Sequence, residues 1–246
     1  MAERTKYIGD RYQRETKYSR ESIGRDNLDR DRMPEPFKEY PDASRVIKLS
    51  PPQHEGGMGL WQALFARRSQ RGFNNSPLTL NELSQLLFAT QGVTAKTGGY
   101  LLRAAPSAGA LYPIESYLIV NRVETLYPGL YHFNVLRNSM ELLGKEHAAS
   151  ALCRAALGQI MIIEGAAVFI WTAVIARSKW KYGERAYRYI YMDAGHIGEN
   201  LYLAAVALNL GCCTIGAFFD DEVNEIIGVD GVKETAVYMG VVGRCD

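Results

Sequence analysis

The chain has 246 residues, of which 47% are hydrophobic, 22% are charged and 11% are aromatic. This composition is typical of a globular protein and excludes a disordered or collagen-like chain. The chain carries 28 Lys and Arg against 27 Asp and Glu, a formal net charge of +1. Because no excess of positive charge would attract a polyanion, we expect neither nucleic acid nor a membrane surface as a partner.

The four cysteines predict neither a disulfide framework nor a CxxC metal site. Cys212 and Cys213 are adjacent, Cys153 and Cys245 stand alone, and the first residues do not resemble a signal peptide. We therefore expect a reducing, cytoplasmic compartment. The longest apolar stretch, Ile160 to Ala176, is interrupted by Glu164 and Gly165, and its second part, Ala166 to Ala176, has 11 residues, against the roughly 20 that a membrane-spanning helix needs. We expect it to be a buried strand.

The N-terminal part of the chain differs in charge from the rest. Residues 1–45 hold 11 basic and 10 acidic residues, so they cannot build a core of their own. We interpret residues 1–50 as a charged extension and 51–246 as the folded domain. The extension is either a solvated arm on the body or an arm that reaches a partner subunit or covers an active site. Its candidate anchors are Tyr7, Tyr12, Tyr18 and Phe37.

The body of the chain mixes helical and strand patterns without a strict βαβ repeat, which favours an α+β fold. Thr79 and Glu82 have the spacing of a capping box, in which each side chain satisfies the other's backbone N–H group. The predicted helices are 59–67, 79–91, 187–210 and 220–227, and the predicted strands are 116–121, 129–134, 139–143, 167–174 and 236–242.

The predicted helix 187–210 is apolar on all sides in its second half, so it must be covered on all sides. It belongs either in the core or at a dimer interface. We expect Gly211 to cap its C-terminus. We further expect Asp220 to cap the next helix and Gly228 to end it.

The sequence lacks the motifs of three common enzyme classes: phosphate-loop nucleotide hydrolases, Rossmann-type dehydrogenases and α/β-hydrolases. The sequence has no GxxxxGK[ST] phosphate loop, no GxGxxG between a strand and a helix, and no GxSxG nucleophile motif. Its histidines, His54, His132, His147 and His196, form no HExxH or HxxxH pattern. We therefore expect no metal site.

A basic cluster follows the predicted helix 59–67. Arg67, Arg68 and Arg71 surround Ser69 within five residues. Guanidinium groups donate to phosphate oxygens in pairs, so the cluster is a candidate anion site. A solvated charged surface is the alternative.

Three further segments are candidates for ligand contact. Small residues between Pro106 and Pro113 form a thin loop that brings backbone close to a flat ligand, although it could equally be a tight connection. Lys181 and Tyr182 follow a buried strand and form a proton-transfer pair if burial lowers the pKa of the lysine, or else they begin an exposed helix. Near Gly216, a backbone N–H can reach a ligand atom.

Taken together, these segments resemble the nitroreductase-like flavoproteins, in particular their SagB-type branch of thiazole- and oxazole-forming dehydrogenases. The resemblance extends from about residue 60 to residue 244. It is carried by RRSQRGF at 67–73, APSAGALYP at 105–113, GLYHFN at 129–134, WKYGERAYRY at 180–189, AGHIGENLYLAA at 194–205 and GCCTIGAF at 211–218.

The resemblance implies a nitroreductase-like α+β fold with a central mixed sheet flanked by helices, in a domain-intertwined homodimer that holds FMN at its interface. The helix 187–210 then corresponds to the interface helix. Arg67, Arg68 and Ser69 match the residues that bind the FMN phosphate. Arg71 matches a basic residue near the pyrimidine edge of the flavin ring. Arg244 matches a C-terminal basic residue on the phosphate.

Other matched positions concern the flavin ring and the substrate. Pro106, Ser107 and Ala108 match the loop that contacts the ring from the other subunit. Ile215 and Gly216 match the backbone opposite flavin N5. Lys181 and Tyr182 match a Lys–Tyr pair that is assigned the removal of the substrate's proton in the azoline oxidases of this family.

The resemblance therefore implies an FMN-dependent oxidoreductase, with hydride transfer at flavin N5 and a small-molecule or peptide-derived C–N substrate. We see no fused cyclodehydratase or peptide-recognition domain, so the substrate stays open. One alternative is a nitro or quinone reductase with NAD(P)H as electron donor. Another is a non-catalytic flavin-binding subunit of a biosynthetic complex.

Overall fold

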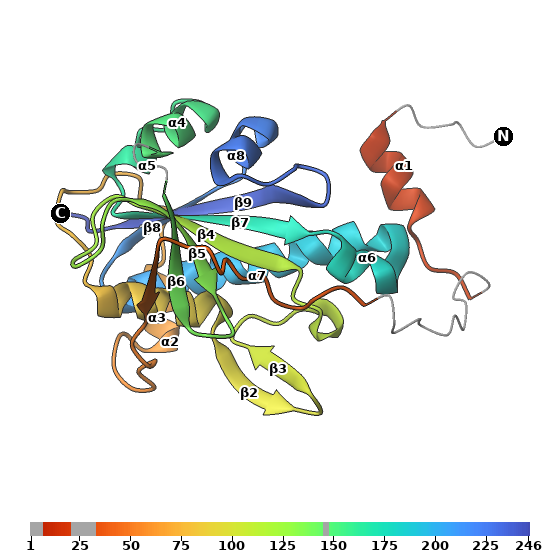
Figure 1. Ribbon diagram of the computed structural model, residues 1–246, viewed down its shortest axis with the longest axis horizontal. Helices are drawn as coiled ribbons and strands as arrows, with labels where there is room; N and C mark the ends of the chain where they lie inside the picture. Colours follow the sequence, from red (N-terminus) through yellow and green to blue (C-terminus); the bar gives the residue numbers. More distant parts are fainter. Residues whose placement is uncertain (1–6, 21–32, 145–147) are drawn as a thin grey trace.

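A seven-stranded sheet forms the centre of the computed structural model, which describes residues 7–20, 33–144 and 148–246 (Figure 1). The strand order is β1-β6-β5-β4-β7-β9-β8, and every pairing between these strands is antiparallel. The strands are β1 (Arg45–Lys48), β4 (Ile114–Val120), β5 (Gly129–Asn134), β6 (Ser139–Gly144), β7 (Ala167–Val174), β8 (Gly211–Ile215) and β9 (Glu234–Gly243). The α+β class is confirmed, but the sheet is antiparallel rather than mixed as we expected.

Helices cover both faces of this sheet (Figure 1). Helices α3 and α7 pack on one face, and α4, α5 and α8 pack on the other. The helices are α1 (Ile8–Glu15), α2 (Leu60–Ala66), α3 (Leu80–Gln91), α4 (Ala148–Ala155), α5 (Met161–Glu164), α6 (Ala176–Tyr182), α7 (Ala186–Ala207) and α8 (Asp220–Ile227). Outside the sheet, β2 (Val93–Thr97) and β3 (Tyr100–Arg103) form a separate hairpin.

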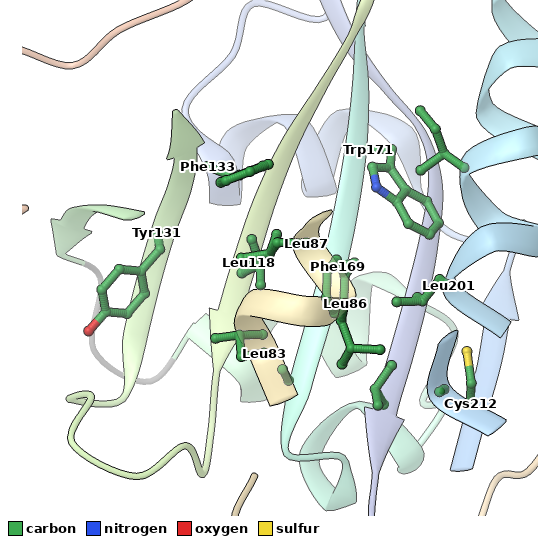
Figure 2. Packing of buried hydrophobic residues seen from close by; sticks show 14 of the residues in the cluster. Leu83, Leu86, Leu87, Leu118, Tyr131, Phe133, Phe169, Trp171, Leu201 and Cys212 are labelled. Carbon is green, nitrogen blue, oxygen red and sulfur yellow. The ribbon is translucent and has the colours of Figure 1, made fainter. Parts of the chain in front are cut away.

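The alternation of side chains along the central strands builds one core on each face. On the α3–α7 side, Leu118 of β4 and Trp171 of β7 pack with Leu86 of α3 and Leu201 of α7 (Figure 2). All four side chains are fully buried. Each buried leucine contributes roughly 1.5–3 kcal/mol of transfer free energy, so α7 is firmly held along the sheet.

Most predicted elements are confirmed, some with shifted ends. The capping box of Thr79 and Glu82 is present at the start of α3. The strand predicted at 167–174 is β7, and the hairpin predicted from 129 to 143 is β5–β6. Strands β1, β2, β3 and β8 were not predicted.

Two of the expected helix caps are wrong. Helix α7 ends at Ala207, and Asn209 rather than Gly211 takes the left-handed conformation, with φ of 57°. Gly211 opens β8, where a β-carbon would collide with Cys245 and crowd Phe73. Asp220 is the first residue of α8 rather than its cap, which is Phe219 without a side-chain bond. Gly228 ends α8 in the left-handed conformation, as predicted.

Parts of the charged N-terminal segment pack against the body. Strand β1 pairs with β6, so the central sheet includes residues on the N-terminal side of the boundary suggested at residue 51. Of the candidate anchors, Tyr12, Tyr18 and Phe37 contact the body, whereas Tyr7 is 71% exposed. Residues 1–6 and 21–32 of the segment, and His147, lie outside the described residues.

Candidate functional site

The basic cluster lies in an extended segment that follows α2 and runs beside β8. Ser69 forms a parallel bridge with Cys212, and the Gln70 N–H donates to the Cys212 carbonyl over 2.9 Å. Further along, the Asn74 N–H donates to the Arg244 carbonyl over 2.8 Å. These bonds bring the backbone of the cluster next to β8 and to the C-terminal end of β9.

Three guanidinium groups of this segment have no carboxylate partner among the described residues. Arg67 lies 5.3 Å from the centre of the Tyr202 ring. Arg68 donates to the carbonyls of Phe65 and Arg67, and Arg71 makes a long 3.5 Å contact with the Ser69 carbonyl. Guanidinium groups that are not paired with a carboxylate can donate to an anion such as a phosphate group.

Tyr202 of α7 connects this segment to β8. Its hydroxyl lies 2.9 Å from Ser69 Oγ and accepts from the Thr214 N–H over 2.9 Å. Tyr238 in turn donates to Thr214 Oγ1 over 2.6 Å. The chain of bonds therefore joins Ser69 to the end of β8, where Ile215 and Gly216 follow.

The end of β8 leaves backbone open at Gly216. A β-carbon at this position would have only Tyr238, at 4.0 Å, within contact distance. Gly216 is exposed and follows the buried Ile215. A ligand can approach this backbone without meeting a side chain.

Arg244 is placed near the cluster by its backbone, but its side chain is engaged elsewhere. Its Nη2 donates to both carboxylate oxygens of Glu82 over 2.9 Å. Its Nε donates to the Pro77 carbonyl over 3.1 Å. In this arrangement Arg244 joins the C-terminal strand to the start of α3, and a role on a bound anion requires exchange of the Glu82 contact.

The loop 105–113 is fastened to the other half of α7 by Asp193. Ser107 Oγ donates to Asp193 Oδ2 over 2.6 Å, and the Ala108 N–H donates to Asp193 Oδ1 over 3.2 Å. Ser107 Oγ also accepts from the Tyr112 N–H over 2.9 Å. Burial raises the pKa of the Asp193 carboxyl, and the bonds from Ser107 and Ala108 oppose that rise.

Lys181 and Tyr182 meet this loop at Gly109. A β-carbon at Gly109 would lie 2.5 Å from the Tyr182 hydroxyl and 2.8 Å from Lys181 Nζ. Gly109 has φ of 66°, a left-handed conformation that suits glycine. The absence of a side chain thus lets an ammonium and a phenol lie against the backbone of the loop, beside Ala108.

The site residues form two groups at opposite ends of α7. The Arg67–Arg71 segment contacts Tyr202, and the loop with Lys181 and Tyr182 contacts Asp193 nine residues earlier. At 1.5 Å per helical residue, these contact points lie about 14 Å apart along the helix axis. Within one chain, the two groups are therefore neighbours of one helix rather than of each other.

Helix α1 packs on the turn that leads from Lys181 and Tyr182 into α7. The Tyr12 hydroxyl donates to the Glu184 carbonyl and accepts from the Arg188 N–H, over 3.2 and 2.9 Å. Arg188 and Arg185 donate back to Thr16. The N-terminal segment thus contacts the turn and the start of α7 that directly follow the Lys–Tyr pair.

Asp193 and Tyr202 had no role assigned from the sequence. Asp193 is the one acidic residue between Tyr187 and Ile197 of a helix with a buried apolar stripe, and such an isolated buried carboxylate signals a partner. Tyr202 carries no such signal. Burial holds the pKa of the Cys212 thiol well above its usual value, which disfavours the reactive thiolate.

The comparisons with known proteins identify this architecture. The model of the Nitroreductase family matches residues 64–244, about three quarters of the chain. The chain belongs to the nitroreductase family. It is therefore an oxidoreductase of this family.

Two relatives of this nitroreductase-family protein differ in sequence identity and in the share of the chain that they match. A presumed nitroreductase of Methanocaldococcus jannaschii is 40% identical over 185 residues, which cover 75% of this chain and 90% of the relative. The trifolitoxin-processing protein TfxB of Rhizobium leguminosarum bv. trifolii is 32% identical over 158 residues, or 60% of this chain. The match covers only 41% of TfxB.

Solved structures share the fold. A presumed nitroreductase of Anabaena variabilis has a TM-score of 0.78 and 31% identity, and covers 96% of this chain but 47% of its own. One from Desulfovibrio desulfuricans, solved in complex with FMN, has a TM-score of 0.54 and 15% identity over 75% of this chain and 85% of its own. The second likeness concerns the fold alone.

Two features are absent from the described residues. No helix in residues 7–20, 33–144 and 148–246 is long and apolar enough to cross a membrane. The same part of the chain holds no group of three His, Cys, Asp or Glu side chains arranged to bind a metal ion.

Proposed function

We propose that this protein is an FMN-dependent oxidoreductase of the SagB type, acting on a small-molecule or peptide-derived C–N substrate. The observation that carries the proposal is the placement of Lys181 Nζ and the Tyr182 hydroxyl against Gly109. These two groups contact the loop that the resemblance assigns to contact with the flavin ring. The match to TfxB supports the same branch.

The residues present fit FMN. Arg67, Arg68 and Arg71 supply cationic groups without a carboxylate partner among the described residues, as a phosphate requires. Ser69 adds a hydroxyl donor, and Arg244 approaches from the C-terminal strand. The open backbone at Gly216, which follows the buried Ile215, leaves room beside a planar ring. When bound, FMN supplies a hydride acceptor at its ring nitrogen N5.

The second group of residues would then serve the substrate. Pro106, Ser107 and Ala108 present thin backbone to the ring, held in place by Asp193. Lys181 and Tyr182 lie within reach of a molecule on that loop and can remove a proton from the atom next to the reacting carbon. A positioned base of this kind contributes roughly 10²–10⁴ in rate.

A homodimer would bring the two groups together from different copies. Leu60, Trp61, Leu64 and Phe65 of α2 are exposed, Trp61 and Phe65 by more than 80%. Tyr191 and Met192 of α7 are also exposed. Large apolar side chains exposed together on one short helix, as on α2, mark an interaction site. We therefore place a second copy of the chain on α2 and α7, with FMN at the contact.

The proposal is tested by absorbance and turnover of the purified protein. We expect a yellow preparation in which Lys181→Met and Tyr182→Phe retain bound flavin but lower turnover by about 10²-fold or more. Lys179→Met, on the same helix in an exposed pair with Glu184, serves as the matched control. Full turnover in both pair variants would contradict the assigned proton transfer.

A second candidate function is an NAD(P)H-dependent nitro or quinone reductase. It is favoured by the 40% identity to the presumed nitroreductase of M. jannaschii. In that reaction, nicotinamide reduces the flavin, and Lys181 and Tyr182 only shape the pocket. Rapid bleaching of the flavin absorbance by NADPH, with turnover unchanged in the Lys181 variant, would favour the reductase.

A further inference from the structure

A cavity of about 240 Å³ is lined by the end of the loop 105–113 and by Trp180, the residue before Lys181. Its walls come from residues 33–37, the β2–β3 hairpin, the end of the loop and α6. Most of the lining is apolar or aromatic, including Phe37, Tyr100, Leu111, Tyr112 and Trp180. Pockets for drug-sized ligands measure roughly 300–1,000 Å³, so this one fits a smaller molecule.

Arg103 is a buried cation on the wall of this cavity. It is only 6% exposed, and its Nη1 donates to the neutral Gln91 Oε1 over 2.8 Å. Its guanidinium carbon lies 4.7 Å from the centre of the Tyr112 ring and 5.6 Å from that of Phe37. Among the described residues, Arg103 Nε has no hydrogen-bond partner.

The nearby acidic group is already committed to other residues. Glu115 pairs with Arg177, the second arginine on the cavity wall, and accepts a bond from His132. Arg177 also donates to the Glu35 carbonyl over 2.8 Å. Burial lowers the pKa of Arg103 to about 10, with the charge of Glu115 only partly opposing this. Within the part of the chain that the structure describes, Arg103 therefore stays a desolvated cation without its own anion.

We propose that this cavity binds a small organic acid, with Arg103 recognising its carboxylate and the aromatic walls enclosing its apolar body. A single guanidinium fork matches the two oxygens and the single charge of a carboxylate. A phosphate dianion would need more cations and a more polar lining. This inference rests on the proposed function, for which it names a substrate class: acids that extend from the cavity toward Lys181 and Tyr182.

The test is calorimetric titration of the flavin-loaded full-length protein with a panel of acids and their neutral amides. The panel contains phenylacetate, 3-phenylpropionate, hexanoate and the three corresponding primary amides, with inorganic phosphate as a further probe. We expect at least one acid to bind about tenfold or more tightly than its amide, because hydrogen bonds to charged groups are the stronger ones. Arg103→Gln should equalise acid and amide, and Arg103→Lys should keep part of the preference.

Arg137→Gln is the matched control, because Arg137 forms an exposed pair with Glu39 at 2.7 Å, outside the cavity lining. It should leave the preference unchanged. If no acid binds better than its amide in the unaltered protein, or if phosphate binds more tightly than every acid, the inference is overturned. The same holds if folded Arg103→Gln keeps the full preference. Flavin content, read by absorbance in the same samples, reports separately on the proposed function.

Discussion

Asp193 shows how one buried carboxylate can organise a loop. Its two oxygens accept from Ser107 Oγ and the Ala108 N–H, and Ser107 also accepts from the Tyr112 N–H. Burying a carboxylate without partners is costly, and the donors of the loop remove that cost. The bonds to Asp193 therefore favour one conformation of the loop. The loop in turn presents Gly109 to Lys181 and Tyr182.

Ser107→Ala should therefore destabilise the protein. We expect the free energy of unfolding to fall by about 1–3 kcal/mol, because Asp193 Oδ2 loses its donor inside the protein. Chemical denaturation monitored by circular dichroism measures the change. Ser44→Ala removes an exposed 3.2 Å bond and should be nearly neutral. An equally small effect at Ser107 would show that Asp193 does not fasten the loop.

The limits of sequence-based prediction at this scale have a physical cause. Spacing indicates Arg67, Arg68 and Arg71 as a cluster, because they are neighbours along the chain. The contact of Arg244 with Glu82 joins residues far apart in sequence and depends on how β9 meets α3. The same holds for Tyr202, whose hydroxyl meets Ser69 and Thr214 only once β8 is in place.

At the scale of elements, a polar cluster crosses the strands β4, β5 and β6. His132 Nδ1 lies 2.9 Å from Glu141 and its Nε2 lies 3.1 Å from Glu115, and all three residues are buried. Burial alone would raise the pKa of Glu115, but the bond from His132 and the charge of Arg177 outweigh it and lower the pKa to about 2. Burial opposes a rise in the pKa of His132, yet its two carboxylate partners raise it.

These shifts define a pH window for stability. The contribution of Glu115 to the free energy of unfolding is fully present above its ordinary pKa of 4.5 and is lost as pH falls toward about 2. The contribution of His132 is fully present below its ordinary pKa of 6.5 and is lost as pH rises through its higher folded value. The cluster should therefore be most stabilising between pH 4.5 and 6.5.

Glu115→Gln should reveal that window. We expect a loss of about 3–5 kcal/mol within it, because Arg177 is left buried without a counter-charge. The difference from the unaltered protein should shrink strongly at acidic pH, where Glu115 becomes protonated. It should shrink by a smaller amount at alkaline pH, where His132 loses its proton while Arg177 stays charged; urea unfolding across this pH range measures both changes. Glu39→Gln, in the exposed pair with Arg137, should cost under about 1 kcal/mol. A difference that does not vary with pH would refute the linkage.

Strongly patterned elements are the ones that sequence predicts. The α3 capping box, the β7 strand and the long α7 helix each follow from residues adjacent in sequence. Strand β1 is four residues long with little apolar alternation, and β8 is a short run after a helix. Their pairing partners, β6 and β9, decide their conformation.

At the scale of the whole molecule, the apolar side chains of α2 stand out because they are exposed to solvent. In the proposed homodimer, this surface is covered by a second copy. Phe65→Glu should then shift the protein from dimer to monomer and lower its flavin content in parallel. Sedimentation velocity and absorbance measure the two quantities.

Val232→Glu is the control, since Val232 is 78% exposed in the turn between α8 and β9. It should change neither the dimer nor the flavin. A Phe65→Glu protein that remains dimeric would contradict the proposed contact. A monomer that keeps all of its flavin would instead contradict a cofactor shared between two copies.

In the proposed function the Arg67–Arg71 segment holds the phosphate of FMN, and a comparison of FMN with riboflavin tests this role most directly. Riboflavin has the same ring system but no phosphate. In titrations of flavin-free protein, we expect FMN to bind about tenfold or more tightly than riboflavin, and Arg68→Gln to remove most of that difference. Equal affinity for both flavins in the unaltered protein, or no affinity for either, would contradict the claim.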